Sequence, residues 1–320
     1  MNALDVRGLT TEFRVHGRWL RAVDGVSFSV KQGEILGLVG ESGCGKSTAA
    51  QSIMRLLPPN ARIVGGEVWL DGEETMGKDE FAMTRQRGSG MALMFQDPMT
   101  SLDPVFSVGE QLVETLEEHL DMTRAQALER AVDLMRQVGI SEPRRRLNAY
   151  PHELSGGMRQ RVALAIAVSC QPRVLIADEP TTALDVTIQA QILRLIRGLA
   201  KGAQQTGVVL ITHDLGVVAQ TCDRVAVMYA GSIVEMADTF SLFAHPSHPY
   251  TQALLGSVVA LGAIRGQLPT IEGAVPDLPA LPGGCRFHPR CPRAKPVCSQ
   301  RPPDRVELPH GGEVACVLYS

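Results

Sequence analysis

The stretch GESGCGKS, residues 40 to 47, is the feature that most constrains how this chain can fold. It fits the pattern G-x-x-x-x-G-K-[S/T]. It lies between an apolar run, Ile35 to Val39, and a helical pattern, Lys46 to Leu57, that ends at the Pro58-Pro59 pair. Glycines let successive backbone N–H groups turn toward one point, and the start of a helix adds the positive end of its dipole. The stretch therefore predicts a phosphate-binding loop between a buried strand and a helix.

The loop's polar residues suit the binding of a nucleotide with its magnesium ion. Lys46 can reach the β- and γ-phosphates, and the Ser47 hydroxyl can ligate Mg²⁺. We expect the whole loop and the start of the helix to surround the phosphates: Gly40, Glu41, Ser42, Gly43, Cys44, Gly45, Lys46, Ser47 and Thr48.

A second apolar run, VLIADE, ends in two acidic residues, Asp178 and Glu179. Ligands of open α/β sheets bind at the carboxyl ends of the strands, where these side chains are expected. Asp178 suits the coordination shell of Mg²⁺, and Glu179 is placed to act as general base on an attacking water. The pair is weak evidence alone and strong evidence beside the phosphate-binding loop.

The remaining pattern predicts an α/β protein with an antiparallel part and a helical insert. Residues 13 to 30 alternate polar and apolar side chains, as half-buried antiparallel strands do. Between about residues 95 and 153 the strand signal fades. There, Thr123 with Gln126 predicts a capping box, and Leu128, Val132 and Met135 share one helical face.

Beyond residue 170 the pattern predicts alternating strands and helices around a parallel sheet. The expected strands are residues 174–177, 208–212 and 225–229. One intervening helix is expected to bury an apolar stripe made of Ile188, Ile192, Leu195 and Leu199.

Composition limits the classes of function. A length of 320 residues suits one large domain with an appendage, and a net charge of −3 argues against a nucleic-acid footprint. The N-terminus has no apolar signal region, and the longest mildly apolar stretch, Leu254 to Ile264, is far shorter than a spanning helix. We therefore expect a soluble chain whose membrane role comes through partners. Cys44, Cys170 and Cys222 are expected to be buried thiols.

The motif LSGGMRQR, residues 154 to 161, identifies the family. Together with the phosphate-binding loop, the acidic strand, ALD at 183–185 and ITHD at 211–214, it closely resembles the ATPase subunits of ABC transporters over roughly residues 1–240. The resemblance implies a P-loop NTPase fold: a RecA-like core with an antiparallel β subdomain and a helical subdomain at about 97–160, within a nucleotide-binding domain at 1–244.

The resemblance also assigns roles to residues. It implies a head-to-tail pair of ATPase domains with two ATP molecules between them, in which Ser155, Gly156 and Gly157 contact the γ-phosphate held by the partner. The resemblance further implies that Asp185 lies at the seam of the pair. It implies that His213 contacts the γ-phosphate and orients the attacking water, and that Gln96 bridges Mg²⁺ and the coupling helix of the transmembrane partner. These residues complete a catalytic set of Lys46, Gln96, Glu179 and His213.

The match to the family's motifs is weaker at two points, the end of the signature and the aromatic residue that stacks on adenine. Met158 stands where many members have glutamine. The aromatic side chain that stacks on adenine is either Phe13, at the family's usual position, or Trp19.

The C-terminal part, residues 245–320, changes to a proline- and glycine-rich, loop-forming composition. HPSHPYTQALL, residues 245 to 255, resembles the C-terminal extension of the oligopeptide/dipeptide branch of ABC importers, which includes nickel and glutathione relatives. This implies a peripheral subunit on the cytoplasmic face of the inner membrane. Its implied partners are two permease subunits, a second ATPase that is a related but different chain, and an extracytoplasmic peptide-binding protein, without nucleic acid.

The implied substrate is a dipeptide or oligopeptide, with nickel or glutathione as alternatives in the same branch. A soluble ABC ATPase of translation or DNA repair is disfavoured, because the chain has one cassette, no coiled-coil insert and no basic patch. A redox-responsive regulatory role remains compatible with transport.

Four cysteines near the C-terminus have the spacing Cys285-x5-Cys291-x6-Cys298-x17-Cys316. A reducing cytoplasm disfavours disulfides, and structural Zn²⁺ sites usually use tight C-x2-C pairs that are absent here. A [4Fe–4S] cluster, held by four thiolates, fits the spacing at least as well. The resemblance favours that cluster over Zn²⁺ and over free thiols.

Overall fold

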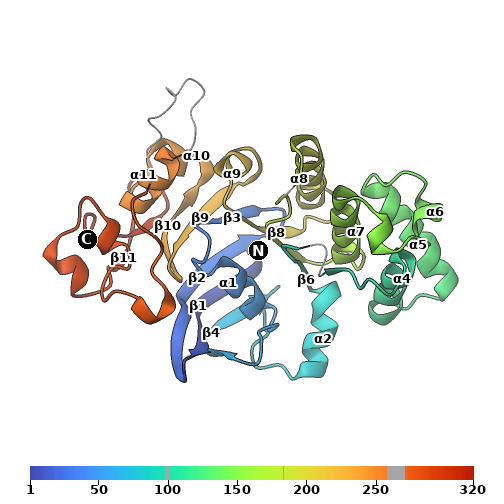
Figure 1. The fold of residues 1–320 in the computed structure, drawn as a ribbon, viewed down its shortest axis with the longest axis horizontal. Helices are drawn as coiled ribbons and strands as arrows, with labels where there is room; N and C mark the ends of the chain where they lie inside the picture. Colours follow the sequence, from blue (N-terminus) through green and yellow to red (C-terminus); the bar gives the residue numbers. More distant parts are fainter. Residues whose placement is uncertain (98–100, 183, 258–270) are drawn as a thin grey trace. The chain divides into compact units, whose positions relative to one another are not determined.

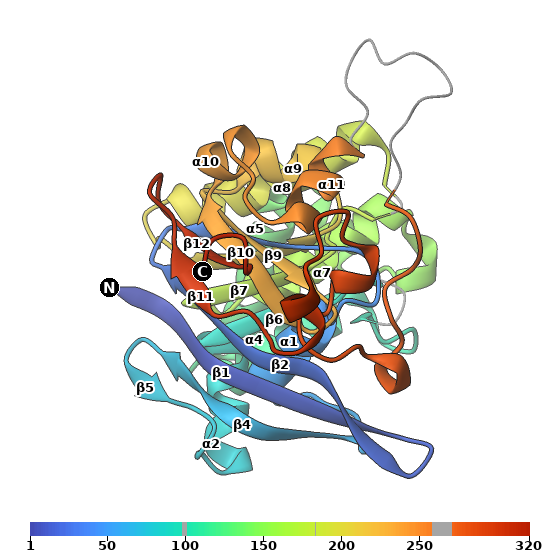
Figure 2. The same ribbon diagram turned by 90° about the vertical axis from the view of Figure 1, so that its left-hand side faces the viewer.

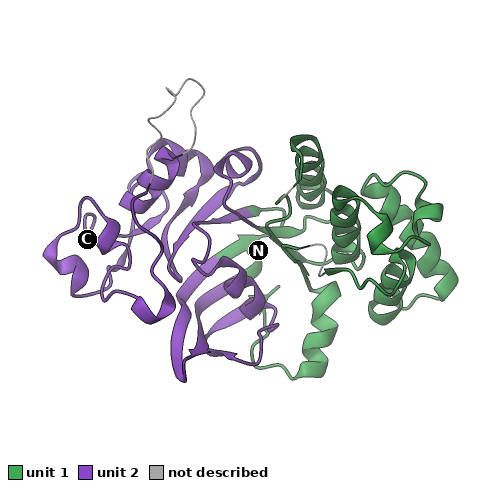
Figure 3. Ribbon diagram, in the orientation of Figure 1, with its two compact units in different colours: residues 1–4, 29–35, 69–210 green, residues 5–28, 36–68, 211–320 purple. Residues whose placement is uncertain are grey.

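A computed structural model describes residues 1–97, 101–182, 184–257 and 271–320 (Figure 1). The chain forms two compact units (Figure 3). Unit 1 comprises residues 1–4, 29–35 and 69–210, and unit 2 comprises residues 5–28, 36–68 and 211–320. Ala183 of the ALD motif, residues 98–100 of the expected helical insert and residues 258–270 of the C-terminal extension lie outside the described residues.

The antiparallel strands expected near the N-terminus are present and lie mostly in unit 2, with residues 2–4 and 29–31 in unit 1. Strand β1 (Asn2–Val15) and strand β2 (Arg18–Lys31) are joined by His16 and Gly17, which both have positive φ, at 48° and 79°. Two consecutive residues of positive φ make the turn that matches the twist of a hairpin. The strand order continues from β2 and β1 to β4 (Ala61–Leu70).

Parallel strands form the core of unit 2. The fully buried β3 (Ile35–Val39) pairs in parallel with β9 (Arg224–Tyr229), and β10 (Ser232–Asp238) pairs antiparallel with β9. These strands confirm the expected runs at 35–39 and 225–229. Helix α1 (Lys46–Ile53) follows β3 but ends four residues before the expected Leu57, because the chain turns at Arg55, where φ is 53°.

Unit 1 has its own parallel strands. Strand β6 (Met91–Met94) pairs in parallel with β7 (Val174–Asp178), and β8 (Gly207–Thr212) is the next strand in order after β7. The short β5 (Glu73–Glu74) pairs with the end of β4, and α2 (Glu80–Ser89) leads to β6. The strands expected at 174–177 and 208–212 are therefore confirmed.

The expected helical insert consists of amphipathic helices around one apolar cluster in unit 1. These elements are α4 (Val108–His119), α5 (Arg124–Gln137), α6 (Pro143–Arg146), the 3₁₀ turn η1 (Pro151–Glu153) and α7 (Gly156–Val168). The capping box of Thr123 and Gln126 is confirmed at the start of α5. Leu128, Val132 and Met135 share one face of α5, on which Val132 and Met135 are buried and Leu128 is 43% exposed.

Helix α8 (Val186–Lys201) buries a narrower stripe than expected. Ile192, Ile196 and Ala200, spaced four residues apart, are completely buried, whereas Ile188, Leu195 and Leu199 are only half-buried. The completely buried residues and the half-buried residues lie in adjacent rows on the same face of the helix. The spacing of apolar residues in the sequence does not distinguish these rows.

The remaining elements of unit 2 belong to its C-terminal part (Figure 2). The helices are α9 (Leu215–Thr221), α10 (Thr239–Ala244) and α11 (Pro249–Gly256). The 3₁₀ turns η2 (Leu278–Ala280), η3 (His288–Arg290) and η4 (Pro296–Ser299) precede an antiparallel pair, β11 (Arg305–Glu307) and β12 (Glu313–Ala315). Strand β12 also pairs antiparallel with β10, so the loop-rich extension adds two strands to the sheet edge of its own unit.

The three scattered cysteines are buried as expected. Cys44, Cys170 and Cys222 are 1%, 5% and 8% exposed, and burial raises the pKa of the Cys222 thiol to about 12. Among the helices of the described residues, none has both the length and the hydropathy that crossing a bilayer requires.

The narrow stripe on α8 predicts unequal effects of two matched substitutions. Ile196→Ala should lower the free energy of unfolding by about 3 kcal/mol, because it leaves a cavity at a fully buried site. The same change at half-buried Ile188 should lower it by about 1 kcal/mol. Urea unfolding followed by circular dichroism measures both, and equal losses would contradict the observed packing of the helix.

Candidate functional site

The phosphate-binding loop of unit 2 has a backbone path that requires glycine at two positions. Gly40 has a φ of 154°, and a Cβ atom there would lie 2.2 Å from the carbonyl oxygen of Met228. Gly45 has a φ of 104°, and its Cβ would lie 2.8 Å from the carbonyl oxygen of Ala22. Any side chain at either position would therefore displace neighbouring backbone.

Lys46, the first residue of α1, is buried inside the curve of this loop. Its Nζ donates hydrogen bonds to the carbonyl oxygens of Gly40, at 2.8 Å, and Glu41, at 3.0 Å. No acidic side chain lies in the first turn of α1, so the positive end of the helix dipole is not neutralised there. The loop can therefore attract an anion with both its backbone and its ammonium group.

The other predicted loop residues differ in exposure. Gly40 and Cys44 are buried, Glu41, Gly45, Ser47 and Thr48 are half-buried, and Ser42 and Gly43 are exposed. Burial raises the pKa of the Cys44 thiol. Cys44 is thus a neutral packing residue whose Sγ lies 3.7 Å from the Lys46 ammonium.

Glu41 connects this loop to the C-terminal extension. Its backbone N–H donates to the Tyr250 hydroxyl at 2.9 Å, and its carboxylate accepts two hydrogen bonds from Arg290, at 2.8 and 3.0 Å. Sequence patterns alone assign no role to Tyr250 or Arg290. The available signal is their position in segments that resemble the importer extension, where Tyr250 follows a His-Pro pair and Arg290 precedes Cys291.

His248 and Glu235 fix the start of α11 and so fix Tyr250. The Nδ1 atom of His248 accepts the Tyr250 N–H at 3.0 Å, and the Glu235 carboxylate accepts the N–H groups of Ser247 and His248, at 2.7 and 2.8 Å. Burial lowers the pKa of His248 to about 4, so its ring is neutral near pH 7 and can accept that hydrogen bond.

The two candidate adenine-stacking rings lie on β1 and β2 of unit 2. Phe13 is half-buried, and Trp19 is 36% exposed. The guanidinium carbon of Arg62 lies 4.0 Å from the centre of the Trp19 ring, so Arg62 already covers one face of that ring.

In unit 1, the acidic pair stands at the carboxyl end of β7, as expected. Asp178 is 6% exposed, and Glu179 adopts a left-handed conformation with φ of 46°. The Glu179 carboxylate accepts hydrogen bonds from the Thr182 hydroxyl at 2.8 Å and from Gln96 Nε2 at 3.2 Å. The fold therefore brings Gln96 and Glu179, which are distant in sequence, into direct contact.

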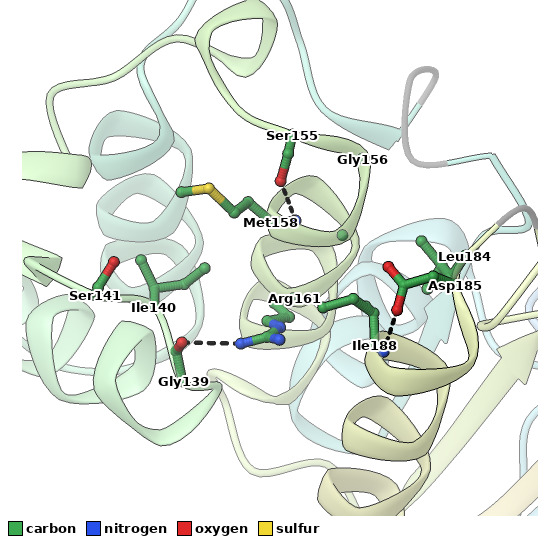
Figure 4. Close-up of a pocket in the computed structure, with 11 residues that line it drawn as sticks. Gly139, Ile140, Ser141, Ser155, Gly156, Met158, Arg161, Leu184, Asp185 and Ile188 are labelled. Carbon is green, nitrogen blue, oxygen red and sulfur yellow. Dashed lines mark hydrogen bonds between the residues drawn. The ribbon is translucent and has the colours of Figure 1, made fainter.

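A solvent-open pocket of unit 1 contains the predicted signature residues (Figure 4). Ser155 caps α7 by accepting the Met158 N–H at 3.3 Å, and Asp185 caps α8 by accepting the Ile188 N–H at 2.9 Å. Ser155, Gly156, Gly157 and Asp185 all line this pocket. Four residues that the sequence nominated from two separate motifs thus share one surface.

Gly157 and Met158 show how the signature packs within unit 1. A Cβ atom on Gly157 would lie 3.0 Å from Cγ2 of Ile188 on α8, so this position leaves little room for a side chain. The half-buried Met158 side chain packs against the apolar cluster of the helical insert. The methionine therefore extends the core and makes no polar side-chain contact of the kind glutamine offers.

His213 follows β8 in unit 2 and is exposed. The next residue, Asp214, caps α9 by accepting the Gly216 N–H at 2.8 Å. The cap fixes the backbone on one side of His213, and β8 fixes it on the other.

The four C-terminal cysteines come together. Cys285, Cys291, Cys298 and Cys316 line one small cavity of unit 2, with a volume of about 10 Å³. All four are free thiols, and burial raises the pKa of Cys285, Cys291 and Cys316. Within residues 1–97, 101–182, 184–257 and 271–320, however, no three metal-ligating side chains converge as a single metal ion requires.

Comparison with known families decides the assignment. Residues 23–182 match the family model described as ABC transporter, and residues 234–298 match the model described as oligopeptide/dipeptide transporter, C-terminal region. This chain is a member of the ABC transporter family. Its enzyme class is that of an ABC ATPase.

Curated relatives cover nearly the whole ABC chain. It is 55% identical to "Probable peptide ABC transporter ATP-binding protein y4tR" of Sinorhizobium fredii, over 98% of this chain and 94% of the relative. It is 46% identical to the oligopeptide transport ATP-binding protein AppD of Bacillus subtilis, over 99% and 96%. It is 47% identical to the oligopeptide transport ATP-binding protein OppD of Escherichia coli, over 94% and 88%.

Solved structures support the fold of this ABC ATPase. The dimeric structure of a post-hydrolysis state of the ATP-binding cassette MJ0796 bound to ADP and Pi is 27% identical, with a TM-score of 0.67, over 74% of this chain and 98% of that one. The structure of cbiO1 from Clostridium perfringens is 25% identical, with a TM-score of 0.64, over 76% and 91%. Both confirm the ABC ATPase fold expected from the sequence.

The buried neutral His248 predicts a pH dependence of stability. An unfolded histidine titrates near pH 6.5, whereas the pKa of His248 in the folded chain is about 4. Between these values only the unfolded state takes up the proton, so the free energy of unfolding should fall by up to about 3 kcal/mol as the pH falls from 6.5 to 4. Denaturant melts across this range measure the slope.

His248→Asn is the matched control for this slope. Asparagine can also cap a helix through its side-chain oxygen, but it does not titrate. As the pH falls from 6.5 to 4, the free energy of unfolding of this variant should fall less steeply than that of the parent chain. An unchanged slope would show that His248 is not the group responsible.

Proposed function

We propose that this chain binds and hydrolyses ATP to energise the import of dipeptides or oligopeptides through partner permeases. The observation that carries the proposal is the glycine-dependent loop that holds the buried Lys46 ammonium against the carbonyls of Gly40 and Glu41. It is joined to an extension that matches the oligopeptide/dipeptide transporter C-terminal region.

In this proposal the loop residues from Gly40 to Thr48 surround the phosphates, and Lys46 neutralises their charge. The Ser47 hydroxyl, the Asp178 carboxylate and the Gln96 amide are the proposed ligands of Mg²⁺, since hard oxygen donors are those that this ion prefers. The burial of Asp178 supports its assignment, because a buried carboxylate at a strand end is suited to pairing with a cation.

Glu179 is the proposed general base, and Gln96 and His213 are proposed to position the attacking water with it. The 3.2 Å contact from Gln96 to the Glu179 carboxylate supports a shared role of these two residues. The left-handed backbone of Glu179 also supports a functional role, because such conformations of non-glycine residues cluster at functional sites.

The signature pocket is proposed to meet the ATP of a second ATPase subunit. Ser155, Gly156 and Gly157 stand at the start of α7, where a serine hydroxyl and glycine N–H groups suit a γ-phosphate. Asp185, on the same pocket, is proposed to lie at the seam of the pair. We propose that the second subunit is a related but different chain.

Phe13 is the proposed adenine-stacking residue. Arg62 covers one face of the Trp19 ring, which supports Phe13 over that alternative.

Within the chain, residues 1–244 are proposed to form the nucleotide-binding domain, which includes a helical subdomain at about 97–160. Residues 245–320 are proposed to form the extension. The subunit is proposed to lie on the cytoplasmic face of the inner membrane, bound to two permeases that receive substrate from an extracytoplasmic peptide-binding protein. Nickel and glutathione remain the alternative substrates of the same branch.

Reconstitution with the permeases and the binding protein tests this proposal. ATP hydrolysis should rise when dipeptides or longer peptides are supplied. If only nickel or only glutathione stimulated ATP hydrolysis, the chain would instead belong to a nickel importer or a glutathione importer of the same branch. Recovery of ribosomes or DNA without any permease in a pull-down would contradict the importer role.

We propose that the four-cysteine cavity holds a [4Fe–4S] cluster. Four free thiols that line one cavity supply the right number and kind of ligands. The alternative is a structural Zn²⁺ ion held by the same four thiolates.

Anaerobic purification tests the cluster proposal. The protein should be brown, with broad absorbance near about 400 nm from thiolate-to-iron charge transfer, and Cys298→Ser should lose this colour. Cys222→Ser, at a buried cysteine outside the cavity, is the matched control and should keep it. A colourless protein that holds stoichiometric zinc would overturn the proposal.

Two substitutions separate ATP binding from hydrolysis. Glu179→Gln should bind ATP and hydrolyse it at least about a hundredfold more slowly, because the base is lost while the phosphate-binding loop remains. Lys46→Ala should weaken ATP binding itself. Equilibrium binding and steady-state phosphate release measure the two effects, and near-normal hydrolysis by Glu179→Gln would contradict the role of the base.

A further inference from the structure

Arg290 ties the C-terminal extension to the phosphate-binding loop. It ends the turn η3 and directly precedes Cys291. Its Nη1 and Nη2 atoms donate to the two carboxylate oxygens of Glu41 at 2.8 and 3.0 Å, across 249 positions of sequence. This parallel, two-point geometry is the strong form of an arginine–carboxylate pair and fixes the orientation of both groups.

The other donors of Arg290 are also satisfied. Nε donates to the Glu272 carbonyl at 2.8 Å, Nη1 donates to the Tyr229 hydroxyl at 3.3 Å, and Nη2 donates to the carbonyls of Ile271 and Gly273 at 3.3 Å. The side chain is only 7% exposed. An exposed ion pair contributes little to structure, but this one is largely buried and all five N–H donors have acceptors. Its geometry is therefore strongly determined.

Glu41 passes this constraint to Lys46. The Glu41 N–H donates to Tyr250, and the Glu41 carbonyl accepts from the Lys46 ammonium at 3.0 Å. Every polar group of Glu41 is thus engaged: the extension holds its side chain and its N–H, and its carbonyl is one of the two that hold Lys46. A displacement of Glu41 would move a hydrogen-bond partner of the ammonium.

The turn that carries Arg290 is itself anchored. Phe287, at the start of this turn, packs with Tyr229 and Tyr250, with ring centres 5.2 and 5.3 Å apart, and all three side chains are buried. Arg286 forms a second anchor, with hydrogen bonds to the Asp24 carboxylate and to the Ala230 carbonyl. The extension therefore presents Arg290 from a rigid base.

We propose that Arg290 is a positioning residue for nucleotide binding: by holding Glu41, it keeps the phosphate-binding loop and Lys46 in the geometry that accepts phosphate. The extension then sets the affinity of a nucleotide that it does not touch. This inference rests on the proposed role of the loop in binding ATP. It goes beyond that role, because it assigns to the extension a part in the nucleotide site.

The test is equilibrium binding of MgATP to the 320-residue chain, measured by displacement of a fluorescent ATP analogue. Partners that orient metal-ligating side chains typically contribute about ten- to a hundredfold to metal affinity. We expect an effect of the same order at this loop, so Arg290→Ala should weaken MgATP binding at least about tenfold. Arg290→Lys keeps the charge without the two-point geometry, so its affinity for MgATP should lie between those of Arg290→Ala and the parent chain. Arg301→Ala, at an exposed arginine of the same extension, is the control and should bind as the parent does.

Glu41→Gln examines the pair from the loop side without altering the extension. It should weaken binding as Arg290→Ala does, and the double variant should be no weaker than the single ones, because both remove the same interaction. Thermal melts of each variant show whether the fold persists. If Arg290→Lys and Glu41→Gln remain folded and bind MgATP like the parent, or if the two losses add in full, the positioning role is wrong.

These results are distinguishable from a failure of the proposed function. A parent chain that binds no MgATP, or binds it equally well with Lys46→Ala, would overturn the nucleotide site itself. A parent that binds through Lys46, with unchanged binding in the Arg290 and Glu41 variants, would overturn only the role of the extension.

Discussion

The hydrogen bonds of Glu41 are the interaction on which the rest of this site depends. Gly40 and Gly45 allow the loop to curve around Lys46. One of the two carbonyl oxygens that accept hydrogen bonds from the Lys46 ammonium belongs to Glu41, and Arg290 holds the Glu41 side chain. The phosphate-binding loop is thus supported by its own strand and helix and also by the last part of the chain. The extension therefore contributes directly to the structure of the phosphate-binding loop.

Much of the architecture could be predicted because its causes are local. The buried run Ile35–Val39, the capping box at Thr123 and the strands expected at 174–177 and 225–229 follow from patterns within about ten residues. The differences are also local: α1 ends early at a left-handed Arg55, and Leu128 is exposed although it shares a helical face with two buried residues. Both depend on packing that the alternation of apolar letters does not encode.

The contacts that join distant segments could not be predicted. The Arg290–Glu41 pair, the pairing of β12 with β10 and the convergence of four cysteines on one cavity all depend on the tertiary fold. Three-residue strands are too short for a periodic signal, and an arginine between prolines and cysteines looks like a solvated loop residue. Tyr250 lies in the segment that resembles the importer extension, but the contact of its hydroxyl with the loop depends on the tertiary fold.

A crystal structure of the Glu179→Gln chain with MgATP would test the role of the phosphate-binding loop directly. We expect the β- and γ-phosphates to lie against the N–H groups of residues 40–47. Lys46 Nζ should lie within hydrogen-bonding distance of a phosphate oxygen, with the Arg290–Glu41 pair intact. Phosphates bound elsewhere on the chain, or a loop that holds them with Glu41 released from Arg290, would contradict this expectation.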